Sequence, residues 1–249
     1  MFYAMPSSQE LCELGSEQLI KMQYLDAIAS FESAEQAALA AADWDLLSRL
    51  YMPLQEARRQ VRQRCGEGIV QFDFIATSRS EQPNADQIAA LYPQGQLLIA
   101  GWASIAPALR LRQLAKLKKH YVETFLGAVY PIGAGRAVVI VPTADVKLPD
   151  ASPRSIDRLI ALLPPHSIIL TDRDIPVGPR TGTPDTYART MELWERLHAP
   201  FLAAADMQID PVQKIHAYRA TIAVDYACEL AHQRLSQTAH ELTRSKRTA

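Results

Sequence analysis

The first stretch of the chain spaces its apolar residues as an amphipathic helix does. Over 6–65 alanine and leucine dominate, and Gly15 is the one glycine. Apolar positions that recur every three or four residues share one face of a helix. Here they are Leu11, Leu14, Leu19, Met22, Leu25, Ile28 and Phe31. Asp43 is placed to cap a helix that begins at Trp44, and the glycines within 66–68 mark the end of this region.

After this region, short apolar runs alternate with helical segments. Four runs predict strands, at 68–77, 96–102, 136–143 and 166–172. The segments between them predict helices, at 85–93, 104–130 and 152–165. Strands that are apolar throughout and alternate with helices favour a parallel sheet covered on both faces. We therefore predict a short, parallel, Rossmann-like sheet of about four strands, whose carboxyl ends lie along one edge.

Helical periodicity returns after residue 184 and continues to the end of the chain. The pattern thus divides the protein into a helical segment at 1–66, an α/β domain at 67–184 and a C-terminal helical segment at 185–249. The predicted fold class is α/β, with helical segments at both ends of the sheet domain.

Small and aromatic residues in the first segment follow the spacing of a known helical repeat of about 34 residues. The matching positions are Leu11, Leu14, Gly15, Tyr24, Ala27, Phe31 and Ala34, followed by Trp44, Leu47, Ser48 and Tyr51. The segment departs from the pattern at Leu11, where Trp is usual, and at Gln18, where an aromatic residue is usual. It resembles the tetratricopeptide repeat family. A small residue at Gly15 would let the paired helix approach closely, with Phe31 as a packing knob.

A weaker match to the same pattern occurs near the C-terminus. It consists of Ile215, Tyr218, Ile222, His232, Leu235 and Ser236, and it departs from the pattern at Lys214 and Tyr226. Two ordinary amphipathic helices would give a similar spacing, so that interpretation stays open. Because about three repeats are needed to bury a repeat core, the N-terminal helices must dock on something else. The candidates are the α/β layer, the C-terminal helices and a second copy of the chain.

The composition of the chain narrows the kinds of partner and the cellular compartment that we expect for the protein. The chain of 249 residues has 26 basic and 27 acidic side chains, so no net field attracts nucleic acid or an anionic membrane. Three cysteines without a short spacing suit a reducing compartment and disfavour a disulfide framework or a thiolate metal site. We see no signal peptide and no apolar run of about 18 residues, and we expect a cytoplasmic protein. The basic residues of 110–120 are expected to form the outer face of an amphipathic helix.

Candidate ligand-binding residues follow the predicted strands, where open parallel sheets bind their ligands. They are Trp102, Ser104, Asp145, Lys147, Asp172, Arg173, Asp174 and Arg180. Asp172 and Asp174 could hold a metal or share acid–base chemistry, and Arg173 or Arg180 could clamp a carboxylate or phosphate. Trp102 could offer a stacking face. The alternative is that these loop residues are solvated, cap helices or pack against other domains.

Several signatures of chemistry are absent from the sequence. It has no Walker-type phosphate loop, and the glycines at 133–135 precede a predicted strand, as in a helix-to-strand turn. Ser104 lacks the flanking glycines of a hydrolase nucleophile, and no histidine pair has the spacing of a zinc site. The sequence therefore predicts no metal and identifies no cofactor.

Three functions are consistent with these patterns. The first is a non-enzymatic interaction or scaffold protein that binds another protein or a second copy of itself. The second is a hydrolase or transferase that uses the carboxyl edge of the sheet. The third is a small-molecule sensor that binds a ligand at the same edge without turnover.

Overall fold

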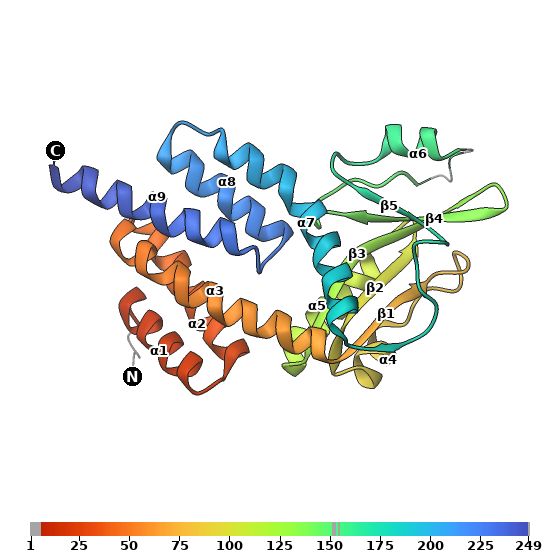
Figure 1. The fold of residues 1–249 in the computed structure, drawn as a ribbon, viewed down its shortest axis with the longest axis horizontal. Helices are drawn as coiled ribbons and strands as arrows, with labels where there is room; N and C mark the ends of the chain where they lie inside the picture. Colours follow the sequence, from red (N-terminus) through yellow and green to blue (C-terminus); the bar gives the residue numbers. More distant parts are fainter. Residues whose placement is uncertain (1–5, 151–152, 154, 249) are drawn as a thin grey trace, which may run out of the picture. The chain divides into compact units, whose positions relative to one another are not determined.

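The computed structural model describes residues 6–150, 153 and 155–248, which form two compact units (Figure 1). The first unit takes in the described residues up to Val61 and from His198 onward, and the second spans Arg62–Leu197. Helices build the first unit, whereas the second is organised around a sheet.

The helical unit contains three helices from the start of the chain and three from its end. They are α1 (Ser8–Ile20), α2 (Tyr24–Ala40), α3 (Trp44–Glu67, through Val61), α7 (Pro184–Asp206, from His198), α8 (Pro211–Val224) and α9 (Glu229–Thr248). Asp43 Oδ1 accepts a hydrogen bond from the backbone N–H of Leu46 at 3.0 Å. The predicted start of a helix at Trp44, with Asp43 as its cap, is therefore confirmed.

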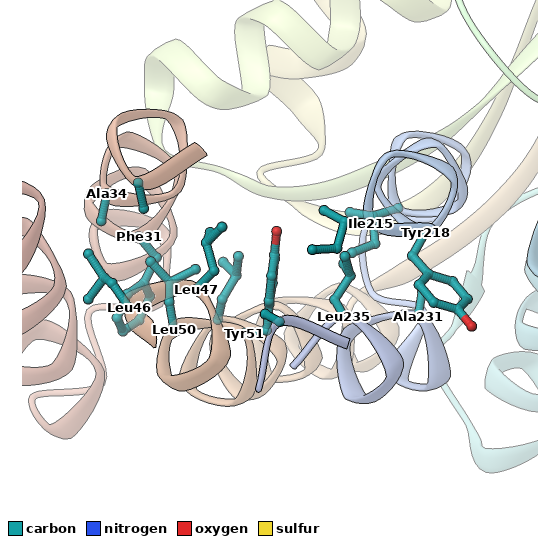
Figure 2. Close-up of a cluster of buried hydrophobic side chains, with 14 of the residues drawn as sticks. Phe31, Ala34, Leu46, Leu47, Leu50, Tyr51, Ile215, Tyr218, Ala231 and Leu235 are labelled. Carbon is teal, nitrogen blue, oxygen red and sulfur yellow. The ribbon is translucent and has the colours of Figure 1, made fainter. Parts of the chain in front are cut away.

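One hydrophobic core joins the two ends of the chain within this unit. Figure 2 shows Phe31, Leu47 and Tyr51 from α2 and α3 in one cluster with Ile215 and Leu235 from α8 and α9. The N-terminal helices thus dock on the C-terminal ones, which was one of the three candidate partners. A short side chain at position 15 permits part of this packing, because a Cβ atom added to Gly15 would lie 2.8 Å from the Phe31 ring.

The second unit contains a curled sheet of mixed direction. Its strands are β1 (Ile69–Ile75), β2 (Gln94–Trp102), β3 (Tyr121–Ile132), β4 (Gly135–Val141), β5 (Ile168–Thr171) and β6 (Arg180–Thr181), in the spatial order β5-β4-β3-β2-β1-β6. Only the pairings of β1 with β2 and of β2 with β3 are parallel, and every other pairing is antiparallel. The prediction of a parallel Rossmann-like sheet is therefore wrong.

The error lies mainly in residues 104–130, which we predicted as one helix. The helix α5 (Ala106–Lys118) ends where Lys119 adopts a left-handed conformation with φ of 53°. The next residues form β3, whose central part is buried. A strand that is buried on both faces has a continuous run of apolar residues. It therefore lacks the alternation of apolar and polar residues that would have distinguished it from a helix. The available signal for a strand was the content of aromatic and β-branched residues, which favour strands; they are Tyr121, Val122, Thr124 and Phe125.

A tight hairpin follows β3 and reverses the chain. Ile132 pairs with Gly135, which leaves two residues in the turn, and Gly133 has the positive φ of 59° that such a turn requires. The predicted helix-to-strand turn is thus a strand-to-strand turn. Because β4 is antiparallel to β3, its carboxyl end at Val141 points away from the carboxyl ends of β1, β2 and β3. The predicted common edge for all four strand ends does not exist.

Both faces of the sheet carry buried side chains. One face packs Leu97, Leu126 and Val139 against helices α4 (Ala85–Leu91), α5 and α6 (Ile156–Leu162). We had predicted the last helix over 152–165, of which 152 and 154 lie outside the described residues. No helix in the described parts of the chain is both long and apolar enough to span a membrane.

The other face holds a buried ion pair. Arg62 donates to Glu123 Oε1 at 2.9 and 2.7 Å, and Gln96 donates to Glu123 Oε2 at 3.0 Å. The Trp194 ring stacks on Phe125 with 4.3 Å between centroids. The Arg62 guanidinium lies 5.0 Å from the centroid of the same indole. Hydrogen bonds and a cation–π contact thus offset the desolvation of this pair.

Candidate functional site

The carboxyl ends of β1 and β2 border two adjoining open hollows. The first has a volume of about 540 Å³ and lies between the end of β1, the loop that follows it and α4. Its lining includes Thr77, Glu81, Gln82, Asn84 and Tyr92. In open α/β sheets, the space outside the carboxyl ends of parallel strands is where ligands commonly bind. This hollow occupies that place at the first pair of parallel strands.

The second hollow has a volume of about 550 Å³ and lies between α4 and the start of α5. Ser104 and Pro107 line it, together with Asp86 and Arg110. Arg110 donates to the two oxygens of Asp86 at 2.9 and 3.3 Å, and both side chains are exposed. This hydrogen-bonded pair lowers the pKa of Asp86, so the carboxylate is ionised beside a guanidinium.

The segment Gln82–Asn84 separates the two hollows and lines both of them. Gln82 Oε1 accepts a hydrogen bond from the backbone N–H of Trp102 at 2.9 Å, while its amide nitrogen donates to the carbonyl of Arg79 at 3.1 Å. Asn84 caps α4 by accepting from the N–H of Gln87 at 3.1 Å. These hydrogen bonds fix the segment Gln82–Asn84 between the end of β2 and the start of α4.

The polar groups of the first hollow favour a ligand that donates hydrogen bonds. The hydroxyl of Thr77 donates to the carboxylate of Glu81, and amide groups of Asn84 and Gln87 lie along the same wall. Tyr92 meets Phe74 edge to face, with 5.5 Å between ring centroids, and adds an apolar side. Two carboxylates, those of Asp73 and Glu81, together with amides and an aromatic ring suit a small polar molecule with hydroxyl or amino groups.

Two of the residues predicted from sequence lie at this place. Trp102 ends β2 and is half-buried, and its backbone holds Gln82. Ser104 lines the second hollow, but its Oγ accepts a hydrogen bond from the N–H of Ala106 at 3.2 Å. That bond satisfies the first backbone N–H of α5, whose N-cap residue is Ile105.

The predicted aspartates after β5 are separately engaged. Asp172 forms an exposed ion pair with Arg136 at 2.5 Å. Asp174 Oδ2 accepts from the N–H and the hydroxyl of Thr171 at 2.7 and 2.8 Å, and the first of these bonds is the main cause of its lowered pKa. Each carboxylate therefore has its own structural partner, and Arg173 between them is exposed.

The remaining predicted residues lie elsewhere on the sheet. Asp145 is exposed in the loop that follows β4, and a hydrogen bond from Thr143 lowers its pKa. Lys147 is exposed in the same loop. Arg180 is in β6, opposite Val70 at the start of β1, and β6 and β5 are the two edge strands of the sheet. The predicted residues thus fall into four separate places, because β4 runs against its neighbours, β3 and β4 lie between β2 and β5, and β6 lies at the opposite edge of the sheet from β5.

Sequence reasoning did not select Glu81, Gln82 or Asn84. The available signal was the polar loop at 77–84, directly after the first predicted strand. This loop lines the two hollows only because α4 and α5 flank it, and the composition of the loop does not reveal those neighbours. Within the described ranges, no three or more His, Cys, Asp or Glu side chains are arranged to hold a metal.

Comparison with known proteins adds no assignment, since no family model, curated protein or solved structure matches the chain.

Proposed function

We propose that this protein is a non-enzymatic interaction protein whose repeat-like helical unit binds another protein or a second copy of the chain. The single observation that carries the proposal is the core shared by helices from both ends of the sequence. A core closed in this way leaves the turns between helices free to carry a binding surface. The close approach at Gly15 and Phe31 supports the resemblance to tetratricopeptide repeats.

Large apolar side chains are exposed at two turns of the helical unit. Ile20 and Met22, at the turn between α1 and α2, are 81% and 67% exposed. Met207 and Ile209, at the turn between α7 and α8, are 81% and 96% exposed. Apolar side chains that gather at the surface are a common mark of protein contact sites. The pair at 207 and 209 is our first choice for testing, since serine there removes apolar area without opening a core.

The test replaces both residues, Met207→Ser and Ile209→Ser, in the full chain. The matched control is Leu117→Ser on α5, where the leucine is 76% exposed. Light scattering measures self-association, and affinity capture from cell extract measures binding of other proteins. We expect the double variant to lose the association that wild type and control retain. Binding that is identical in all three proteins, or absent in wild type, would contradict the proposal.

The two hollows support a second proposal, in which the sheet unit binds a small polar ligand as a sensor or as a hydrolase or transferase. Glu81→Gln removes one of the two carboxylates that line the first hollow, and Glu67→Gln is a control on an exposed carboxylate of α3. Hydroxyl- and amine-bearing compounds should raise the melting temperature of wild type and control more than that of Glu81→Gln. Turnover assays with the stabilising compounds then separate a sensor from an enzyme. Equal shifts in all three proteins would exclude this hollow.

A further inference from the structure

The first hollow, at the carboxyl end of β1, is lined by two carboxylates and by no basic side chain among the described residues. Asp73 lies on β1, and Glu81 lies in the loop that follows it. Elsewhere on the sheet unit, Asp86 pairs with an arginine at 2.9 Å, and Asp172 pairs with another at 2.5 Å. The carboxylates of the hollow have no such cation beside them in the described parts of the chain, so their negative charge is unbalanced.

Neutral donors fix both carboxylates without cancelling their charge. Gln71 Nε2 donates to Asp73 Oδ1 at 2.8 Å, and the backbone N–H of Gly178 donates to Asp73 Oδ2 at 2.7 Å. The hydroxyl of Thr77 donates to Glu81 Oε2. Because each carboxylate oxygen can accept two hydrogen bonds, both groups can still accept from a ligand. Asp73 is half-buried, where an opposite charge stabilises it more than in open solvent.

The other side of the hollow is apolar. Phe74 and Tyr92 both line it and meet edge to face, with 5.5 Å between ring centroids. Ile88 and Leu91 of α4 line it as well, and Leu91 is 63% exposed. A cation is attracted to the face of an aromatic ring, and an apolar body gains by leaving water for such a wall. The hollow thus combines negative charge with aromatic and aliphatic surface.

These groups disfavour other classes of ligand. An anion would meet two negative charges and no described basic side chain, whereas a cleft lined by one sign of charge concentrates ligands of the opposite sign. A hydroxyl group donates one hydrogen bond and brings no charge. An ammonium group donates three hydrogen bonds and brings the charge that the hollow lacks.

We propose that the first hollow binds a small primary amine carried on an aromatic body. Such binding rests on the second proposed function, in which this hollow holds a small polar ligand, and narrows that ligand to an organic cation. The ammonium group lies at Asp73 and Glu81, and the ring of the ligand lies against Phe74 and Tyr92. The volume of about 540 Å³ falls within the range of small-molecule sites, about 300–1,000 Å³.

The test titrates 2-phenylethylamine into the full-length chain near neutral pH and measures the dissociation constant from two-dimensional NMR spectra. Two probes of similar shape serve as controls: 2-phenylethanol lacks the charge, and 3-phenylpropanoate carries the opposite charge. We expect the amine to bind about tenfold more tightly than the alcohol, and the anion to bind more weakly than either. Raising NaCl from about 0.05 M to about 0.5 M should weaken binding of the amine and leave the alcohol unchanged.

Two substitutions locate the site. Glu81→Gln and Asp73→Asn each keep the shape of the side chain and remove one charge. Each should weaken binding of the amine about threefold to tenfold, with little effect on the alcohol. Glu67→Gln, at an exposed carboxylate of α3, should bind the amine as tightly as wild type does.

The comparison of the three probes in wild type needs no variant, so a folding defect cannot hide the answer. An alcohol that binds as tightly as the amine would overturn the amine site and leave the second proposed function standing. Absence of binding by the amine would also overturn it, whereas the proposed function falls only if the wider set of hydroxyl compounds fails too. Amine binding that is unchanged in both Glu81→Gln and Asp73→Asn would place the amine elsewhere and contradict the proposal.

Discussion

The raised pKa of His198 makes the stability of the helical unit depend on alkaline pH. The pKa rises from 6.5 to about 10 on folding because of Asp225 and Cys228, against the effect of burial. The folded pKa lies above the unfolded one, so the stabilisation is fully present below about pH 6.5 and is lost as pH rises through about 10. At about 1.4 kcal/mol per unit, the full effect is about 5 kcal/mol, and about 3 kcal/mol of it is lost between about pH 7 and about pH 9.5.

Urea unfolding, followed by the helical circular-dichroism signal at several pH values, measures this loss. The comparison is wild type against His198→Gln, with His216→Gln as the control. The raised pKa values of Cys12 and Cys65 also reduce stability at alkaline pH, because their unfolded thiols ionise first. That contribution is the same in all three proteins and cancels in the difference. We expect His198→Gln to be less stable near pH 7 and to converge with wild type near pH 9.5.

Parallel stability curves for wild type and His198→Gln over this range would refute the reasoning. They would mean that the imidazole does not carry a proton in the folded protein that it lacks in the unfolded one. The same result would leave Asp225, which is 1% exposed, without the positive charge that we assign to its hydrogen-bond partner.

Three further sets of substitutions test the packing and the buried charges. Gly15→Ala places a Cβ 2.8 Å from the Phe31 ring and should lower the free energy of unfolding by about 1–3 kcal/mol, although helix propensity alone predicts a gain. Glu123→Gln removes the carboxylate that faces buried Arg62 and should cost about 3–5 kcal/mol, whereas Arg62→Met with Glu123→Leu should recover most of it. Because the pKa of His232 is lowered to about 3, its stabilisation is present above about pH 6.5 and falls with acid. From about pH 7.5 to about pH 5, wild type should lose about 2 kcal/mol more than His232→Gln, and equal losses would contradict this.

The elements that could be predicted were those whose signal is local. The helix that begins at Trp44 has its cap at Asp43, and the strand at β4 is a run of alanine, valine and isoleucine between a tight turn and a proline. Each of these needs only neighbours in sequence to form. The contact of Gly15 with Phe31 could also be anticipated, because a repeated spacing of small and aromatic residues implies close helix pairing.

The predictions that were wrong concern features that depend on contacts between residues distant in sequence. The strand β3 is apolar because it is buried on both faces, and an apolar run of this kind does not distinguish a strand from a helix. The place of Arg180 could not be anticipated, since β6 consists of two exposed residues paired with β1, about a hundred positions earlier in the chain. The candidate residues at 102, 145, 172 and 180 separated for the same reason.

The sequence by itself determined most helices, four of the strands and the requirement that the N-terminal helices dock on another part of the protein or on a second copy. These follow from apolar spacing, caps and turn residues, which act over a few residues. Only the tertiary structure decided the direction of β4, the core shared by both ends of the chain, and the pairing of His198 with Asp225. Such pairings depend on how distant segments share buried surface and satisfy their polar groups, and no local pattern records that.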